Sequence, residues 1–223
     1  MSFNKKLKNQ CLIKNNRLCI GLDIDNQKLK KTSLDYMESF LKDIIDATID
    51  ICPVYKINFA FYEKHGSMGF RIIEKLCKHI DNKAITIADA KRGDIGNSSK
   101  YYAQAIFDHF NFDSITVAPY MGIDSIEPFV SFDKDKGVFI LALTSNPGSN
   151  NFQKKIIKDK ELFKHVIELC NDLNLNQNVG LVIGATNVDN LEEVNKISNN
   201  LPWLMPGIGF QGGDLKKSIS IGE

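Results

Sequence analysis

Residues 84–94 read AITIADAKRGD, an apolar run followed at once by a cluster of charges. The run 84–88 is typical of a strand that is buried on both faces. Asp89 and Lys91 are two residues apart, so on an extended backbone their side chains point to the same face. Charges beside a buried segment are costly unless they are paired. We therefore expect Asp89, Lys91 and Asp94 to form a functional cluster at the end of a strand.

Short apolar runs alternate with amphipathic stretches along the rest of the chain. The predicted strands cover residues 18–22, 54–57, 84–88, 114–118, 138–143, 180–183 and 203–205. Helix-like stretches lie between them, for example residues 36–49, 69–80, 99–110, 161–173 and 188–197. This alternation predicts a parallel sheet with helices outside it, because parallel strands need a crossover that is usually a helix. The predicted fold class is therefore α/β.

The predicted sheet has seven strands, one fewer than a TIM (β/α)8 barrel. The residues after the last glycine-rich segment, 215–223, can supply most of one helix and no further strand. Two interpretations stay open: an open α/β sheet, or a barrel that lacks its final strand–helix unit. No linker, repeat or low-complexity tract marks a second domain, so we expect residues 1–223 to form a single domain.

The N-terminal segment has its own pattern. Phe3, Leu7 and Cys11 recur at helical spacing, which predicts an amphipathic helix that covers one end of the core. A transit peptide is the alternative interpretation of this basic segment, which lacks the apolar stretch of a signal peptide.

The composition excludes several classes of protein. The 223 residues carry a formal net charge of +1, so the chain has no electrostatic footprint for nucleic acid or a membrane surface. No segment reaches the roughly 18 apolar residues that a membrane span needs. The five cysteines lack a CxxC spacing, which favours a reducing, cytoplasmic compartment without structural disulfides or a zinc site. Because no HxH or HExxH pattern occurs, we expect no metal site.

Polar side chains follow five of the predicted strands, at the point where each strand ends. In chain order they are Asp23, Lys56 with Asn58, Asp89 with Lys91 and Asp94, Ser145, and the segment 206–214. In a barrel these strand ends converge on the face that holds the active site. We expect Lys56 to pair with Asp89, which gives an alternating array of four charges with Lys91 and Asp94. A lysine kept protonated by such an array can deliver a proton to a carbanion. A carboxylate beside it repels an anionic substrate group, and both properties suit a decarboxylation.

Two loops carry weaker signals. The segment 207–213 reads GIGFQGG, and its glycines let backbone N–H groups approach a phosphate. An ordinary loop that needs positive φ angles would have the same composition. The segment 145–148, SNPG, is typical of a turn, and Ser145 could also bind an amide group of a substrate.

Together these segments resemble the orotidine 5′-phosphate decarboxylase family, in the branch found in many bacteria and in plasmodial enzymes. The matching segments are 21–23 (GLD), 56–63 (KINFAFYE), 89–97 (DAKRGDIGN), 144–148 (TSNPG) and 206–214 (PGIGFQGGD). They occur in the family's order over nearly the whole chain. The resemblance implies a TIM barrel that converts orotidine 5′-phosphate to UMP and CO2, the last step of de novo pyrimidine synthesis, with no cofactor and no metal.

The resemblance also implies a role for each matching residue. Lys91 is implied to protonate C6 of the pyrimidine, with Asp89 against the substrate carboxylate and Lys56 between Asp89 and the ribose. The other implied substrate contacts are Asp23 and Asn58 at the ribose and base, Ser145 at the pyrimidine amide, Pro206 near the base, Gly209 in the phosphate loop, and Gln211 at both phosphate and base. The family is a homodimer with shared sites, so Asp94 and Ser98 are implied to come from the partner subunit.

The chain departs from the family pattern at its C-terminal end. Family members continue into an eighth strand that ends with an arginine gripping the phosphate, and no residue here matches that arginine. We therefore expect either a C-terminally incomplete sequence or an impaired form. Two alternatives stay open. One is a sugar-phosphate decarboxylase or aldolase with the same DxKxxD pattern, which usually needs Mg²⁺. The other is a truncated barrel that binds nucleotide weakly or only associates with a partner chain.

Overall fold

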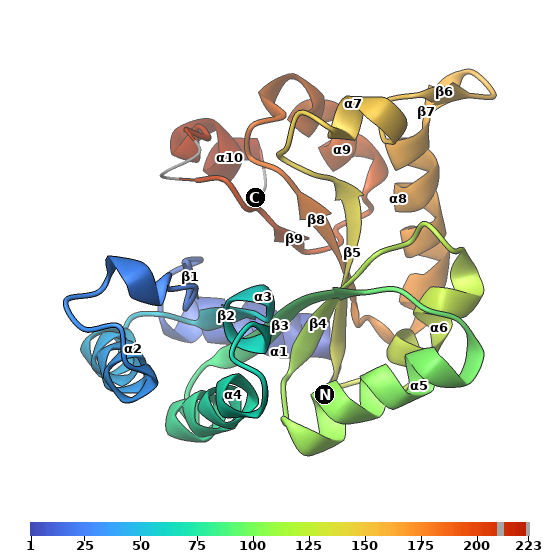
Figure 1. The fold of residues 1–223 in the computed structure, drawn as a ribbon. Helices are drawn as coiled ribbons and strands as arrows, with labels where there is room; N and C mark the ends of the chain where they lie inside the picture. Colours follow the sequence, from blue (N-terminus) through green and yellow to red (C-terminus); the bar gives the residue numbers. More distant parts are fainter. Residues whose placement is uncertain (209–211, 222–223) are drawn as a thin grey trace.

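A computed structural model describes residues 1–208 and 212–221 of the chain. Seven parallel strands form one curled sheet (Figure 1): β1 (Cys19–Gly21), β2 (Val54–Asn58), β3 (Ile85–Arg92), β4 (Ser114–Val117), β5 (Gly137–Leu143), β8 (Val179–Ile183) and β9 (Trp203–Leu204). They pair in the order β1-β2-β3-β4-β5-β8-β9, which follows the chain. All seven predicted strands are therefore confirmed.

Helices lie along the outer face of this sheet (Figure 1). The longer ones are α2 (Leu34–Thr48), α4 (Ser67–Ile80), α5 (Gly96–Gln104), α6 (Ile123–Val130) and α8 (Leu162–Leu173). The shorter helical segments are η1 (Asn26–Lys28), α3 (Ala60–Glu63), η2 (Ala105–His109), α7 (Ser149–Phe152), η3 (Asn174–Asn176), η4 (Val188–Asn190), α9 (Leu191–Ile197) and α10 (Leu215–Ile221). A small antiparallel hairpin, β6 (Ile156–Ile157) and β7 (Lys160–Glu161), precedes α8.

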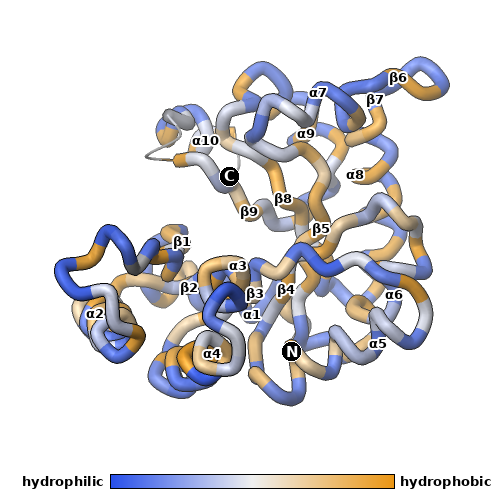
Figure 2. The backbone as a smooth tube through the Cα atoms, in the orientation of Figure 1, coloured by the Kyte–Doolittle hydropathy of each residue, from blue (hydrophilic) through white to orange (hydrophobic). Residues whose placement is uncertain are grey.

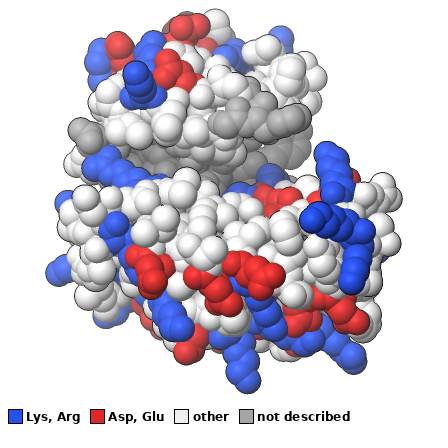
Figure 3. Space-filling view, turned by 90° about the vertical axis from the view of Figure 1, so that its left-hand side faces the viewer, with Lys and Arg blue, Asp and Glu red and all other residues white. Residues whose placement is uncertain are grey.

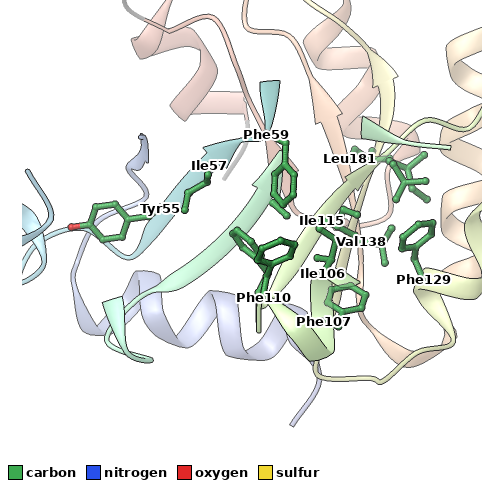
Figure 4. Packing of buried hydrophobic residues seen from close by; sticks show 14 of the residues in the cluster. Tyr55, Ile57, Phe59, Ile106, Phe107, Phe110, Ile115, Phe129, Val138 and Leu181 are labelled. Atoms are coloured by element: carbon green, nitrogen blue, oxygen red, sulfur yellow. The ribbon is translucent and has the colours of Figure 1, made fainter. Parts of the chain in front are cut away.

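The main hydrophobic core lies between the sheet and these helices. Each helix buries the apolar residues that recur along one of its faces, as Met37, Leu41 and Ile45 do in α2. The tube is hydrophobic along the strands and along the helix faces that meet them (Figure 2). Aromatic rings fill the space at the centre of this layer, where the rings of Phe59 and Phe110 meet edge to face at 5.7 Å (Figure 4).

A second, smaller core lies where the N-terminal helix α1 (Phe3–Ile13) meets the amino ends of the strands. Phe3 is fully buried there and packs edge to face on Phe139 of β5 at 5.9 Å. Its backbone N–H donates to the carbonyl of Lys134, and Lys6 of the same helix forms an ion pair with Asp113 at 2.5 Å. The predicted N-terminal helix that covers one end of the core is confirmed.

The two edges of the sheet are β1 and β9, and in the described part of the chain these strands do not pair with each other. Viewed from that side, the molecule has a groove between the part that carries β1 and the part that carries β9 (Figure 3). The sheet is thus curled like part of a barrel, and it is open where the first and last strands face each other (Figure 1).

Three segments differ from their sequence predictions. The third strand continues to Arg92 instead of ending at residue 88, because pairing with β4 resumes at Arg92 after an irregularity. Helix α6 was not specified among the examples of predicted helices; Pro128 lies inside it, yet the helix is held by buried Ile126 and Phe129. The predicted helix 99–110 begins earlier, at Gly96, and its last part is a π-helix. The β6–β7 hairpin was also missed.

None of the helices in residues 1–208 and 212–221 is long and apolar enough to cross a membrane.

Candidate active site

Four charged side chains form one continuous chain of contacts at the carboxyl ends of β1, β2 and β3. The ammonium of Lys56 lies 2.6 Å from one carboxylate oxygen of Asp23 and 3.3 Å from one of Asp89. The other oxygen of Asp89 lies 2.6 Å from the ammonium of Lys91. The predicted Lys56–Asp89 pair is confirmed. We name Asp23, Lys56, Asp89 and Lys91 the charge chain.

Asp89 is the most enclosed member of the charge chain, with a side chain only 10% exposed. Burial alone raises the pKa of a carboxyl group, but the ammonium groups of Lys56 and Lys91 and the hydroxyl of Thr116 outweigh it. The net result is a pKa of Asp89 below its ordinary value. Asp89 is therefore an anion at neutral pH despite its burial.

Lys56 is stabilised as a cation by two carboxylates. Burial lowers the pKa of an ammonium, but the charges of Asp23 and Asp89 and the hydrogen bond to Asp23 raise it further, so that the pKa of Lys56 lies above its ordinary value. Asp23 is itself held by the backbone N–H of Asn58, which donates to its second oxygen at 2.8 Å. The sequence analysis expected Asp23 near a ribose and did not identify it as the partner of Lys56.

Lys91 lies where β3 departs from regular pairing. Ala88 is opposite Ile115 and Arg92 is opposite Val117, so residues 89–91 of β3 face the single residue Thr116 of β4. Lys91 takes a left-handed backbone conformation with φ of 46°, which is unusual for a residue with a side chain. Bulges of this kind redirect side chains and are common beside active sites. The Lys91 side chain remains 49% exposed, so its ammonium is reachable from outside the charge chain.

Ser145 follows β5 in a loop that is fixed from three sides. The side chain of Gln153 accepts from the backbone N–H of Thr144 at 2.8 Å, and the side-chain amide of Asn187 donates to the carbonyl of Thr144 at 3.0 Å. The hydroxyl of Thr186 donates to the carbonyl of Ser145 at 3.1 Å. These contacts hold the backbone around Ser145, and the sequence analysis missed all three partners, of which Thr186 and Asn187 lie far from Ser145 along the chain.

Asp94 and Ser98 stand apart from the charge chain. Within the described residues Asp94 joins no ion pair, and its carboxylate accepts from the backbone N–H of Ile95 at 2.8 Å. The backbone of Asp94 is anchored by the hydroxyl of Ser99, which donates to its carbonyl. Ser98 is exposed in the first turn of α5. Asp23, rather than Asp94, thus supplies the second carboxylate of the array inside one chain, and the expected supply of Asp94 by a partner subunit stays a prediction.

The remaining predicted substrate contacts lie at the same ends of the strands. Asn58 ends β2 and is partly exposed, and partly buried Pro206 follows β9, where its carbonyl accepts from the N–H of Ala185 at 2.9 Å. Gly209 and Gln211 lie outside the described residues. In the part of the chain that the structure covers, no group of three or more His, Cys, Asp or Glu side chains is arranged to hold a metal ion.

Comparison with known proteins agrees with this geometry. The family model described as "Orotidine 5'-phosphate decarboxylase / HUMPS family" matches residues 16–218. The chain belongs to this family. It is 46% identical to the orotidine 5′-phosphate decarboxylase of Dehalococcoides mccartyi, over 100% of this chain and 83% of the relative.

Solved structures give the same family and fold. The Leishmania donovani OMP decarboxylase is similar with a TM-score of 0.87 and 35% identity, over 100% of this chain and 84% of that one. A Toxoplasma gondii structure described as a candidate orotidine-monophosphate decarboxylase has a TM-score of 0.94 and 35% identity, over 99% of this chain and 84% of that one. The predicted TIM-barrel type of fold is confirmed, and the family membership makes this chain an enzyme of the carboxy-lyase class.

Proposed function

We propose that this protein decarboxylates orotidine 5′-phosphate to UMP and CO2. The observation that carries the proposal is the charge chain, in which an anionic Asp89 holds the half-exposed ammonium of Lys91 at the carboxyl ends of the strands. This arrangement fits a reaction that removes a carboxylate and then needs a proton. The family membership and the names of the relatives support the choice of substrate.

In the proposed mechanism the bond between C6 of the pyrimidine and the carboxylate carbon breaks, and its electron pair stays on C6. The carbanion at C6 has no conjugated carbonyl to take up this charge, so it must be stabilised by fixed charges close by. The ammonium of Lys91 provides that charge and then transfers a proton to C6. Asp89 keeps Lys91 in position, and its own anion lies against the leaving carboxylate.

The other substrate contacts follow from the positions of side chains around the charge chain. We propose that Lys56, Asp23 and Asn58 bind the ribose and the base, that Ser145 binds the amide edge of the pyrimidine, and that Pro206 packs near the base. Gly209 and Gln211, which lie outside the described residues, are proposed to serve the phosphate. The fixed backbone of Ser145 supports its part in this proposal, since a preorganised hydrogen-bonding group loses little freedom when a ligand binds.

We further propose a homodimer in which Asp94 and Ser98 of each subunit complete the site of the other. Asp94 has no ionic partner among the described residues, and Ser98 is exposed. Several large apolar side chains of α5, α7, the start of α6 and the segment that leads into it are exposed, and exposed apolar surface is typical of an interface. They are Tyr101 (68%), Tyr120 (82%), Met121 (45%), Ile123 (50%) and Phe152 (63%).

Two broader proposals complete this account. We propose that residues 1–223 act as one barrel domain, since the main core joins strands and helices from Leu22 to Leu201. We propose a cytoplasmic location, because all five cysteines are free thiols, as expected in a reducing compartment.

The test is an absorbance assay in which purified protein is mixed with orotidine 5′-phosphate in excess EDTA. We expect the orotidylate absorbance to decrease and UMP to form, since the proposed mechanism uses no metal. Activity that is lost in EDTA and restored by Mg²⁺ would instead favour a sugar-phosphate enzyme. Absence of orotidylate depletion with or without Mg²⁺ would overturn the proposed function.

The shared site has a separate test in mixed dimers. Chains that carry Lys91→Ala and chains that carry Asp94→Ala should each be nearly inactive alone. In verified heterodimers one of the two sites regains both groups if Asp94 crosses between subunits, so about half of the wild-type turnover per dimer should return, by the site arithmetic of a two-fold dimer. Heterodimers without any recovery would contradict cross-subunit supply.

A further inference from the structure

Thr116 is buried in β4, with only 1% of its surface exposed, and its hydroxyl touches both Asp89 and Lys91. The hydroxyl oxygen lies 3.0 Å from the backbone nitrogen of Lys91 and 3.0 Å from a carboxylate oxygen of Asp89. The same oxygen of Asp89 also receives the ammonium of Lys91. No other hydroxyl among the described residues has contacts to two members of the charge chain.

The direction of these two hydrogen bonds is fixed by chemistry. A backbone N–H can only donate, so the Thr116 oxygen must accept from Lys91. A hydroxyl has a single proton, and that proton is therefore free to point at Asp89, whose carboxylate accepts it. The pair of bonds therefore needs an accepting oxygen of Asp89 opposite Thr116, and the Asp89 carboxylate provides it.

Thr116 also compensates for the bulge in β3. Three residues of β3 face Thr116 alone, so the regular ladder cannot supply a backbone carbonyl for the N–H of Lys91. The side chain of Thr116 takes the place of that carbonyl and holds Lys91 in its left-handed conformation. Beyond the bulge the ladder resumes, since the N–H of Ala118 donates to the carbonyl of Arg92 at 2.8 Å.

We propose that Thr116 is a positioning residue for the decarboxylation: its one hydroxyl fixes the carboxylate of Asp89 and the backbone of Lys91 together, and so sets the direction of the proton-donating ammonium. The inference rests on the proposed function. Thr116 acts through Asp89 and Lys91 and need not touch the substrate. A misdirected ammonium binds the ground state almost as well but stabilises the carbanion poorly, so the effect belongs in kcat.

The chain offers a matched control in Thr86 of β3. Its hydroxyl also accepts from a backbone N–H, that of Asp113 at 3.0 Å, and donates to a buried carboxylate, that of Asp113 at 3.0 Å. Thr86 lies at the opposite end of the strands, away from the charge chain. Thr86→Val removes two hydrogen bonds of the same kind from a site that is also buried, and it tests for a merely structural effect.

The experiment compares Thr116→Val, Thr116→Ser and Thr86→Val with the wild type. Thr116→Val should lower kcat by about ten- to a hundredfold, the effect of one lost hydrogen bond to a charged group, with KM changed by less than about threefold. Thr116→Ser keeps the hydroxyl and should stay within about threefold of wild type. Thr86→Val should lower the melting temperature but leave kcat unchanged. If Thr116→Val does not fold, Thr116→Ala carries the same expectation.

Equal loss of kcat in Thr116→Val and Thr86→Val would overturn the proposal, and so would a Thr116→Val enzyme with wild-type kcat or a Thr116→Ser enzyme without rescue. Amide hydrogen exchange gives a readout that does not need activity. The N–H of Lys91 should lose its protection in Thr116→Val and keep it in Thr116→Ser. If the wild type does not turn over orotidylate, the proposed function fails. If the exchange of the Lys91 N–H in Thr116→Val is the same as in the wild type, Thr116 does not hold the backbone of Lys91.

Discussion

Strands β3 and β4 carry the same local arrangement at both of their ends: a threonine hydroxyl bonded to a buried carboxylate in, or directly before, the neighbouring strand, and a lysine paired with that carboxylate. At the amino ends Thr86, Asp113 and Lys6 form this set, and at the carboxyl ends Thr116, Asp89 and Lys91 form it. The two sets differ in what surrounds the lysine. Lys6 belongs to a helix that is docked against the core, whereas Lys91 lies on a bulge and is joined to Lys56 and Asp23 through Asp89.

The two sets show that the same combination of threonine, aspartate and lysine can serve two purposes. A closed set of hydrogen bonds around Asp113 ties α1 to the sheet, which is a contribution to stability. The set around Asp89 leaves the ammonium of Lys91 half exposed beside an anion, which is a contribution to chemistry. In TIM barrels the carboxyl ends of the strands hold the active site and the amino ends serve stability, and the two lysines follow that division.

The largest expected difference in turnover is between removal of Lys91 and removal of Lys6. Lys91→Ala should reduce orotidylate turnover by about a thousandfold or more, because it removes the proposed proton donor and the charge proposed to stabilise the carbanion. Lys6→Ala should leave turnover unchanged and lower only the thermal stability. Both are measured by steady-state kinetics and thermal melting on protein whose oligomeric state has been verified. Substantial residual turnover in Lys91→Ala would contradict its role as donor.

The two aspartates should give the next largest contrast. Asp89→Asn removes the anion that orients Lys91 and Lys56, and turnover should fall by about a hundredfold or more. Asp113→Asn breaks the bonds to Thr86 and Lys6 and should reduce the free energy of unfolding by about 2 kcal/mol while turnover persists. Kinetics and denaturant unfolding on the same preparations separate these outcomes. The division between the two ends would be wrong if Asp113→Asn lost as much turnover as Asp89→Asn.

Substitution of one glycine near each end of the strands tests the same division between the proposed site and the stabilising end. A methyl group at Gly184 would lie 2.5 Å from the backbone nitrogen of Ser145, so Gly184→Ala should displace Ser145 and raise KM by up to about tenfold. A methyl group at Gly137 would lie 2.3 Å from the ring of Phe3, so Gly137→Ala should cost about 1–3 kcal/mol of stability without a change in KM. The two variants are compared by KM and by denaturant midpoint. Equal KM values would show that Ser145 does not depend on Gly184.

The smallest expected effect is a pH dependence of stability. The pKa of Asp89 is lowered in the folded state, so near and below the ordinary carboxyl pKa of about 3.9 the unfolded chain binds more protons than the folded one. The stabilisation from Asp89 is therefore present above that pH and is lost as the pH falls through the lowered pKa. Denaturant unfolding between pH 3 and pH 7 should show a shallower acid limb for Asp89→Asn than for wild type. Identical slopes would mean that Asp89 contributes no such stabilisation.

The sequence predicted those features that depend on local pattern. The run 84–88 followed by charges identified the strand end with Asp89 and Lys91, and alternation of apolar runs identified all seven strands. Helix α6 was left unspecified, and in it burial of Ile126 and Phe129 overrides the unfavourable effect of Pro128 on a helix. The amphipathic pattern of Phe3 and Leu7 was sufficient to predict α1.

The contacts that complete the site depend on pairing between distant strands. Thr116 lies in the strand SITV, where a threonine is an ordinary β-branched residue, and nothing in the sequence marks the bulge that faces it. The partnership of Asp23 with Lys56 likewise arises from the register of β1 and β2. Gln153 and Asn187 reach the Ser145 loop from separate elements, which no spacing rule reveals.

The most direct test of the charge chain as the catalytic centre is calorimetric binding of two nucleotides, UMP and the barbiturate nucleotide whose ring carries an anionic oxygen at C6. That oxygen imitates the carbanion, so wild-type protein and Lys6→Ala should bind the barbiturate nucleotide at least about a hundredfold more tightly than UMP. Lys91→Ala should lose most of this preference while still binding UMP. Equal affinities in the wild type, or a full preference retained in Lys91→Ala, would contradict the account.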